Sequence, residues 1–151
     1  MKTLRAALMM LGLAMYSALS YAAGQVQVRD AWIPEAPPVA DVMAAYFVIE
    51  NHGDKPVTIS GASSPAFGMV MMHKSVDENG MVRMIHQDHL TVAANSQLAF
   101  ARSGLHLMLM SPKHPLKLGD KVELTLHTAD HQQIHFTAIV KAATLGDDHP
   151  H

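Results

Sequence analysis

The sequence predicts an all-β fold, an antiparallel β-sandwich or barrel built from short strands. Short apolar or alternating segments recur from residue 26 to residue 140, and turn-forming residues separate nearly all of them. The chain of 151 residues also lacks cysteine, so its core alone must stabilise the fold without disulfides. The same absence excludes blue-copper electron transfer, cysteine-type zinc sites and thiol-disulfide catalysis by the protein's own residues.

Residues 1–22 have the pattern of a secretory signal peptide. Lys2 and Arg5 give a basic start, an apolar run follows over Ala6–Leu19, and a small-x-small cleavage site ends at Ala22. We therefore expect cleavage near position 22/23 and export to the periplasm. The apolar run is short for a membrane span and no later stretch is long enough, so a retained N-terminal anchor is the less favoured alternative.

Residues 23–144 form one expected domain, and residues 145–151 an expected flexible tail rich in His and Asp. The segments with strand patterns, from which we expect seven to nine strands, are 26–33, 43–50, 57–59, 67–76, 81–85, 90–92, 97–101, 105–110, 121–127 and 133–140.

Side-chain alternation and apolar runs support the first three segments. Val26, Val28 and Trp32 share one parity in the first segment, as expected for one face of a strand. The second segment is a nearly continuous apolar run that closes at the turn cluster 51–54, and residues 63–65 break the chain after the third.

Turns and prolines bound the later segments. Turn-forming residues stand between them at 77–80, 94–96, 103–104, 118–120 and 129–130. The proline-containing stretches 35–38 and 111–115 are expected to be loops, because proline cannot donate the ladder hydrogen bond of a central strand.

Asn79 and Gly80 predict the register of a hairpin between the fourth and fifth segments. This pair is the preferred sequence of a two-residue type I′ loop. Such a loop places His73 opposite His86 and brings Met84 onto the same sheet face. His73 and Met84 are then one diagonal step apart, roughly 7–8 Å between α-carbons. One extra loop residue would place them on opposite faces.

A second pair of candidate ligands lies on the segment 105–110. His106, Met108 and Met110 share one face of this strand, and the leucines between them share the other. The leucine face is the expected core face, so the His/Met face should point away from the core. Methionine usually fills gaps inside a core, so its position here indicates a binding site, at one rim of the sandwich.

The donor atoms select the ion. Calcium and magnesium require oxygen ligands, and zinc rarely takes a thioether. Cu(I) suits two imidazoles and two thioethers best, and Ag(I) should bind as its mimic. The alternative is that each residue has an ordinary role, His at the surface and Met in packing.

The spacing His73-x10-Met84-x21-His106-x-Met108 resembles the signature of the PCu(A)C family of periplasmic copper chaperones. The segments 30–33, 44–51 and 103–109 also resemble that family. The resemblance implies a cupredoxin-like Greek-key β-sandwich that binds Cu(I) through His73, Met84, His106 and Met108. It implies a metallochaperone, not an enzyme, that delivers copper to the CuA site of a haem-copper cytochrome oxidase. The oxidase copper subunit or a Sco-type thiol protein would be recipient or partner.

Two further residues are candidate auxiliary ligands. Met71 shares the parity of His73, and His86 stands opposite His73 in the predicted register. The alternative for His86 is a solvated strand histidine. The tail residues His149 and His151 are candidates for weak Cu(II) binding, with a simply solvated chain end as the alternative.

Two other functions are compatible with part of the sequence. A copper-dependent redox enzyme with an N-terminal His ligand is disfavoured, because cleavage near position 22 leaves Ala23 first. An Ig-like interaction module would carry the His and Met residues incidentally and gain no stability from a metal. No basic run or phosphate-binding glycine loop indicates nucleic acid. We expect a monomer.

Overall fold

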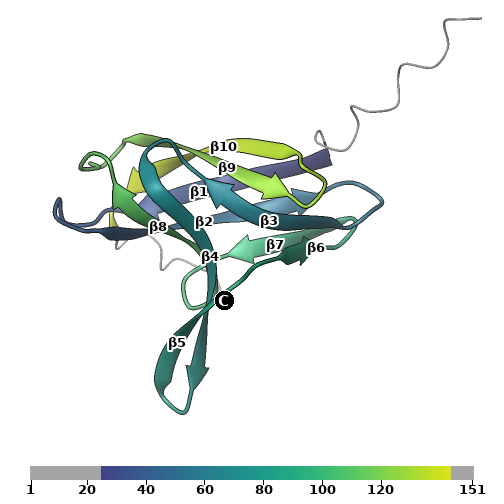
Figure 1. Ribbon diagram of the computed structural model, residues 1–151, viewed down its shortest axis with the longest axis horizontal. Helices are drawn as coiled ribbons and strands as arrows, with labels where there is room; N and C mark the ends of the chain where they lie inside the picture. The colour runs from purple at the N-terminus through teal and green to yellow at the C-terminus, as the bar shows by residue number, and fades with distance from the viewer. Residues whose placement is uncertain (1–24, 144–151) are drawn as a thin grey trace, which may run out of the picture.

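The computed structural model describes residues 25–143, and these form ten β-strands (Figure 1). The strands are β1 (Val26–Pro34), β2 (Val42–Asn51), β3 (Val57–Ser63), β4 (Phe67–Glu78), β5 (Met81–His86), β6 (Leu90–Val92), β7 (Ser96–Phe100), β8 (Leu105–Pro112), β9 (Lys121–Thr128) and β10 (Gln133–Lys141). Every segment with a strand pattern forms a strand, so the expected count of seven to nine was too low. The predicted signal peptide and the 145–151 tail lie outside the described residues.

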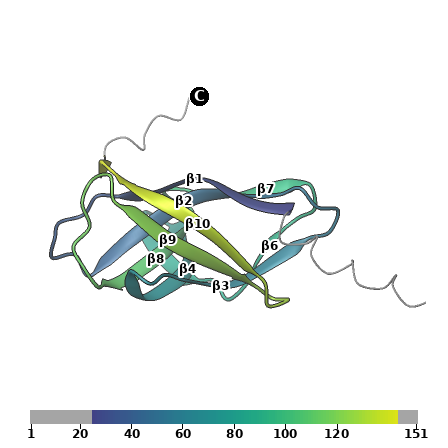
Figure 2. The same cartoon turned by 90° about the horizontal axis from the view of Figure 1, so that it is seen from above.

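The strands are arranged as two layers that share β2 (Figure 2). The order along the sheet is β5-β4-β8-β2-β1-β10-β9-β3-β6, with β7 also paired to β2. The first half of β2 pairs with β8, through Val42–Ala45, and its second half pairs with β7. Because β2 changes partner along its length, the strands β5, β4 and β8 fold over the others as a sandwich.

The core lies between these layers, and every strand except β5 contributes to it. Leu107 and Leu109 of β8 are fully buried, and so are Leu126 of β9 and Ala138 of β10. Met72 of β4 is also buried in this cluster. The all-β prediction is therefore confirmed, and so is the assignment of the leucine face of β8 to the core.

Two details of the expected sheet were wrong. The sheet is not wholly antiparallel, because β1 pairs with β10 in parallel through Trp32–Pro34. Pro112 was expected in a loop but ends β8, opposite Phe67 of β4. A proline is tolerated there because the pairing of β8 with β2 ends at Met110, so Pro112 is not part of a ladder on that side.

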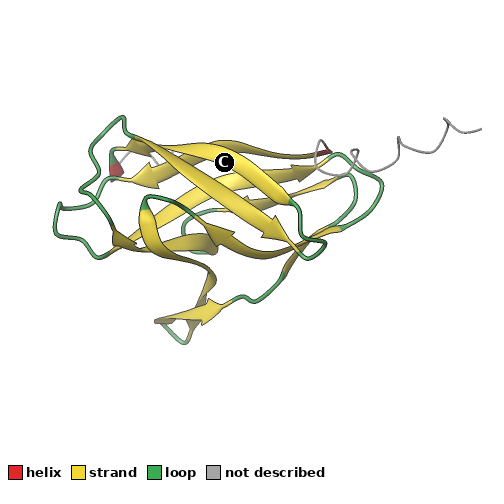
Figure 3. Ribbon diagram, turned by 45° about the horizontal axis from the view of Figure 1, so that its top comes forward, coloured by secondary structure: helices red, strands yellow, loops and turns green. Residues whose placement is uncertain are grey.

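The β4–β5 hairpin extends beyond the body of the sandwich (Figures 1 and 3). All six residues of β5 are exposed, whereas β8 on the other side of β4 is largely buried. Among residues 25–143 no helix has the length and hydropathy that crossing a membrane requires.

Candidate metal centre

Three neighbouring strands bring the predicted histidines into one row. β4 lies between β5 and β8, and His73 is paired with His86 on one side and with His106 on the other. The ring centroids are 5.3 Å apart for His73 and His86, and 6.0 Å apart for His73 and His106. Paired residues share a sheet face, so all three imidazoles project from the same side.

The hairpin register predicted from Asn79 and Gly80 is confirmed. Both residues have positive φ, 57° and 80°, as a type I′ turn requires. Glu78 pairs with Met81, and Ser75 with Met84. Met84 therefore shares the face of His73, at one diagonal step from it, although its side chain remains 57% exposed.

The methionines of β4 and β8 form a second row beside the histidines. Met71 is paired with Met108, two residues along each strand from His73 and His106. Met108 and Met84 consequently lie on opposite sides of the histidine row. In a flat sheet, two strand spacings and four residues separate their α-carbons by roughly 16 Å. Met71 is thus closer to Met108 than Met84 is.

His106 is buried on the face that points away from the leucine core. Its side chain and backbone are only 5% exposed, because the turn before β8 lies against it. The His106 Nδ1 atom is 3.1 Å from the Gly104 carbonyl oxygen, which can only accept, so Nδ1–H is the donor. This tautomer leaves the Nε2 lone pair for a ligand. A backbone carbonyl that orients a metal-binding imidazole in this way is a common arrangement.

His73 presents a buried nitrogen that lacks a hydrogen-bond partner within the described structure. This atom is Nδ1, and a buried polar atom without a partner is costly unless a ligand satisfies it. Burial lowers the pKa of His73, and the neighbouring His86 and His106 lower it further. The neutral imidazole is the form that binds a metal ion.

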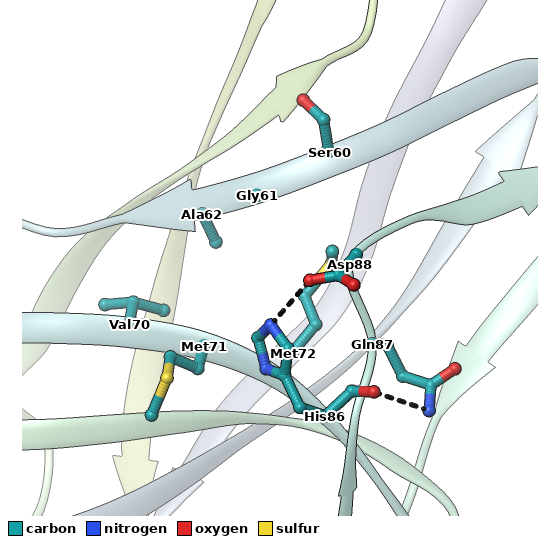
Figure 4. Close-up of a pocket in the computed structure, with 9 residues that line it drawn as sticks. All are labelled: Ser60, Gly61, Ala62, Val70, Met71, Met72, His86, Gln87 and Asp88. Atoms are coloured by element: carbon teal, nitrogen blue, oxygen red, sulfur yellow. Dashed lines mark hydrogen bonds and ion pairs between the residues drawn. The ribbon is translucent and has the colours of Figure 1, made fainter.

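His86 occupies the exposed end of the histidine row. Its Nε2 atom lies 3.1 Å from Oδ1 of Asp88, and both side chains are solvent-exposed. His86 and Asp88 also border a hollow between β3 and β4, which Figure 4 shows with Met71 and Met72 on opposite sides of β4. His86 is therefore near His73 but already has an acidic partner.

Within residues 25–143, no three His, Asp or Glu side chains converge closely enough to hold a metal ion by themselves. The donors that lie beside the histidines are thioethers, so the arrangement suits a soft cation and not an ion that needs oxygen ligands. The sequence predicted the candidate ligands separately on each strand. No local pattern in the sequence predicted that β4 pairs with β8, which brings the histidines of the two strands together.

Comparison with known proteins agrees with this reading of the fold. The family model LpqE-like, described as "Putative lipoprotein LpqE-like", matches residues 26–140. The chain belongs to the LpqE-like family. A relative of this LpqE-like protein from Leifsonia xyli subsp. xyli, named "Putative lipoprotein Lxx21020", is 34% identical over 106 residues, which are 70% of this chain and 63% of the relative. Uncharacterized protein RP573 of Rickettsia prowazekii is 28% identical over 91 residues, 60% of this chain and 50% of that protein. The match thus spans less than two thirds of either relative.

Solved structures share the fold of this LpqE-like protein over nearly their whole length. Apo-DR1885 from Deinococcus radiodurans is 30% identical with a TM-score of 0.62, and the match covers 94% of this chain and 95% of that one. The copper-bound PCuAC domain from PmoF2 has a TM-score of 0.66 at 21% identity, covering 81% of this chain and 97% of that one. The resemblance to the PCu(A)C family and the cupredoxin-like sandwich it implied are confirmed.

Proposed function

We propose that this LpqE-like protein is an exported Cu(I) chaperone that binds one ion through His73, Met84, His106 and Met108. The observation that carries the proposal is the pairing of His73 with His106 beside the pair Met71 and Met108. Two imidazoles and at least two thioethers thereby face one side of adjacent strands. Such neutral donors favour Cu(I), and Ag(I) as its mimic, over zinc, calcium or magnesium.

The state of both imidazoles supports ligation. His73 has an unpartnered buried nitrogen, and His106 is held in the tautomer that frees Nε2. A buried imidazole nitrogen whose partner is absent is better explained by a ligand than by packing. The structure of Cu(I)-bound DR1885, 34% identical over 74% of this chain, shows that a relative of this fold carries the same ion.

Met84 completes the site from the exposed hairpin. Its position across the histidine row means that the hairpin must bend or twist toward β8 for Met84 and Met108 to contact one ion. Met71 and His86 are auxiliary donors in this proposal, because each is paired with or adjacent to a ligand. An ion held partly by the exposed β4–β5 hairpin is accessible to a protein that accepts copper.

The function is binding and transfer rather than catalysis. Neutral ligands leave bound Cu(I) cationic, so a thiolate acceptor, a stronger donor, can remove it. We propose that the recipient lies in the periplasm and is the CuA site of a haem-copper cytochrome oxidase, reached directly or through a Sco-type thiol protein. The 145–151 tail remains a proposed weak Cu(II) site.

An anaerobic Cu(I) titration against a chromophoric chelator tests the ligand set. The informative variant exchanges neighbours, Met84→Ile with Ile85→Met, which keeps composition and moves the thioether to the opposite hairpin face. We expect it to bind Cu(I) as weakly as Met84→Leu. The matched control is Met81→Leu, because Met81 is also an exposed methionine, at the far end of the same strand. Parent-like binding by the exchanged variant would exclude Met84 as a ligand.

A further inference from the structure

We propose a second soft-metal site, specific for Cu(I) or Ag(I), formed by the thioethers of Met69, Met71 and Met110. The three residues lie on β4 and β8, and Met69 is paired directly with Met110. Met71 follows Met69 by two residues and so shares its face. The site uses none of the four proposed chaperone ligands, and it shares only Met71, which would be an auxiliary donor there. His73 lies two residues beyond Met71 on β4, and His106 lies four residues before Met110 on β8.

The spacing allows three sulfur atoms to meet. Directly paired residues have β-carbons about 4.5–5.5 Å apart, and residues i and i+2 of a strand are separated by about 6.8 Å. A methionine side chain has three rotatable bonds and extends its sulfur several bonds beyond the β-carbon. Each of the three sulfurs can therefore reach a point above the centre of the triangle that the three β-carbons form.

Met69, Met71 and Met110 do not fill gaps in the core, which is the usual structural role of methionine. Their strand neighbours Val70, Met72 and Leu109 supply the packing on the core, and Leu109 is fully buried. Met69 is instead 54% exposed, while Met71 and Met110 are half-buried on the outer face. An exposed strand face gains more from β-branched or polar residues than from methionine. Three methionines on one outer face of two paired strands are better explained by what their sulfurs bind.

The chemistry of three thioethers restricts the ligand. Sulfur in a thioether is neutral and soft, which suits monovalent Cu(I) or Ag(I) and disfavours zinc, calcium and magnesium. A trithioether set lacks the imidazoles of the first site, so it should hold its ion more weakly. Met71 lies between Met69 and His73, which gives the two ions adjoining positions on one face.

Native mass spectrometry of the full-length mature protein, titrated with Cu(I) under reducing anaerobic conditions, tests the proposal. We expect the parent to bind two ions and Met69→Leu/Met110→Leu to lose the second and retain the first. The control is Met43→Leu/Met72→Leu, which removes two buried core methionines and should still bind two ions. His106→Ala should lose the tighter ion, and it distinguishes failure of the proposed chaperone site from failure of this one.

Two outcomes would overturn the second site. One is a parent that takes up a single Cu(I) throughout the titration. The other is a second ion that persists in Met69→Leu/Met110→Leu, because that ion would have to be bound elsewhere in the chain. Ag(I) titration followed by the chemical shifts of the methionine methyl groups gives an independent reading, with Met69, Met71 and Met110 shifting together.

Discussion

The two sides of β4 differ in how firmly they hold their candidate ligands. On one side β8 lies within the sandwich, with Leu107 and Leu109 fully buried and His106 almost so. On the other side β5 is exposed at every residue and carries Met84 on a projecting hairpin (Figure 1). The comparison teaches that the proposed site would combine a preorganised half with an accessible half. In the proposed function the buried half would supply affinity, and the exposed half would supply a route for transfer.

The largest expected effect is on the free energy of unfolding. Substitutions on β8 should lower it much more than substitutions on the β4–β5 hairpin. Leu107→Ala should lower the free energy of unfolding by about 2–5 kcal/mol, because it opens a cavity in a fully buried position. Val82→Ala on the hairpin should change it by less than about 0.5 kcal/mol. Chemical denaturation of the metal-free protein measures both. Equal losses would mean that the hairpin is part of the cooperative core.

The next effect concerns His106, the proposed ligand on the buried side. His106→Ala should weaken Cu(I) binding by at least about 100-fold, because losing even a supporting partner of a ligand costs about 10–100-fold. Chelator competition measures the change. His86→Ala is the comparison on the exposed side. As an auxiliary donor that already has Asp88 as a partner, His86 should matter less, and its loss should weaken binding by less than about 10-fold. A larger effect for His86 than for His106 would reverse the assignment of the two sides.

Met84 should matter less for affinity than His106. Met84→Leu keeps the apolar volume but removes the sulfur. The β4–β5 hairpin that carries Met84 must bend for this sulfur to reach the ion. We expect a loss of about 10-fold, near the lower limit for supporting partners. Because the ion would be held by one donor fewer, transfer to a dithiol acceptor should also become faster. Stopped-flow transfer kinetics test this, and an unchanged or slower rate would argue against Met84 as a donor that retains the ion.

The smallest effect is expected from the turn itself. Gly80 has a φ of 80°, a conformation that costs an L-residue about 1–2 kcal/mol. Gly80→Ala should therefore loosen the hairpin and weaken Cu(I) binding by less than about 10-fold, with little change in the thermal midpoint of the metal-free protein. Gly61→Ala is a matched control, because open space surrounds that glycine and its φ is not in the left-handed region. A marked fall in the thermal midpoint for Gly80→Ala alone would show that the hairpin supports the core.

The sequence by itself determined the strands and the local faces. Alternation assigned Leu107 and His106 to opposite sides of one strand, and Asn79-Gly80 set the hairpin register that places Met84 with His73. Both inferences depend on neighbours within a few residues, where backbone geometry leaves few choices. The errors at Pro112 and in the β1–β10 pair came from positions whose environment depends on which strand lies alongside.

Only the tertiary structure decided that the two predicted donor pairs lie on one face of adjacent strands. β4 and β8 are separated in sequence by three other strands and a turn, so no local pattern specifies that His73 pairs with His106. That choice depends on burying Met72, Leu107 and Leu109 together against the opposite layer. The same pairing placed Met71 beside Met108 and Met69 beside Met110. The sequence contained the candidate ligands, and the packing of the core brought them onto one face.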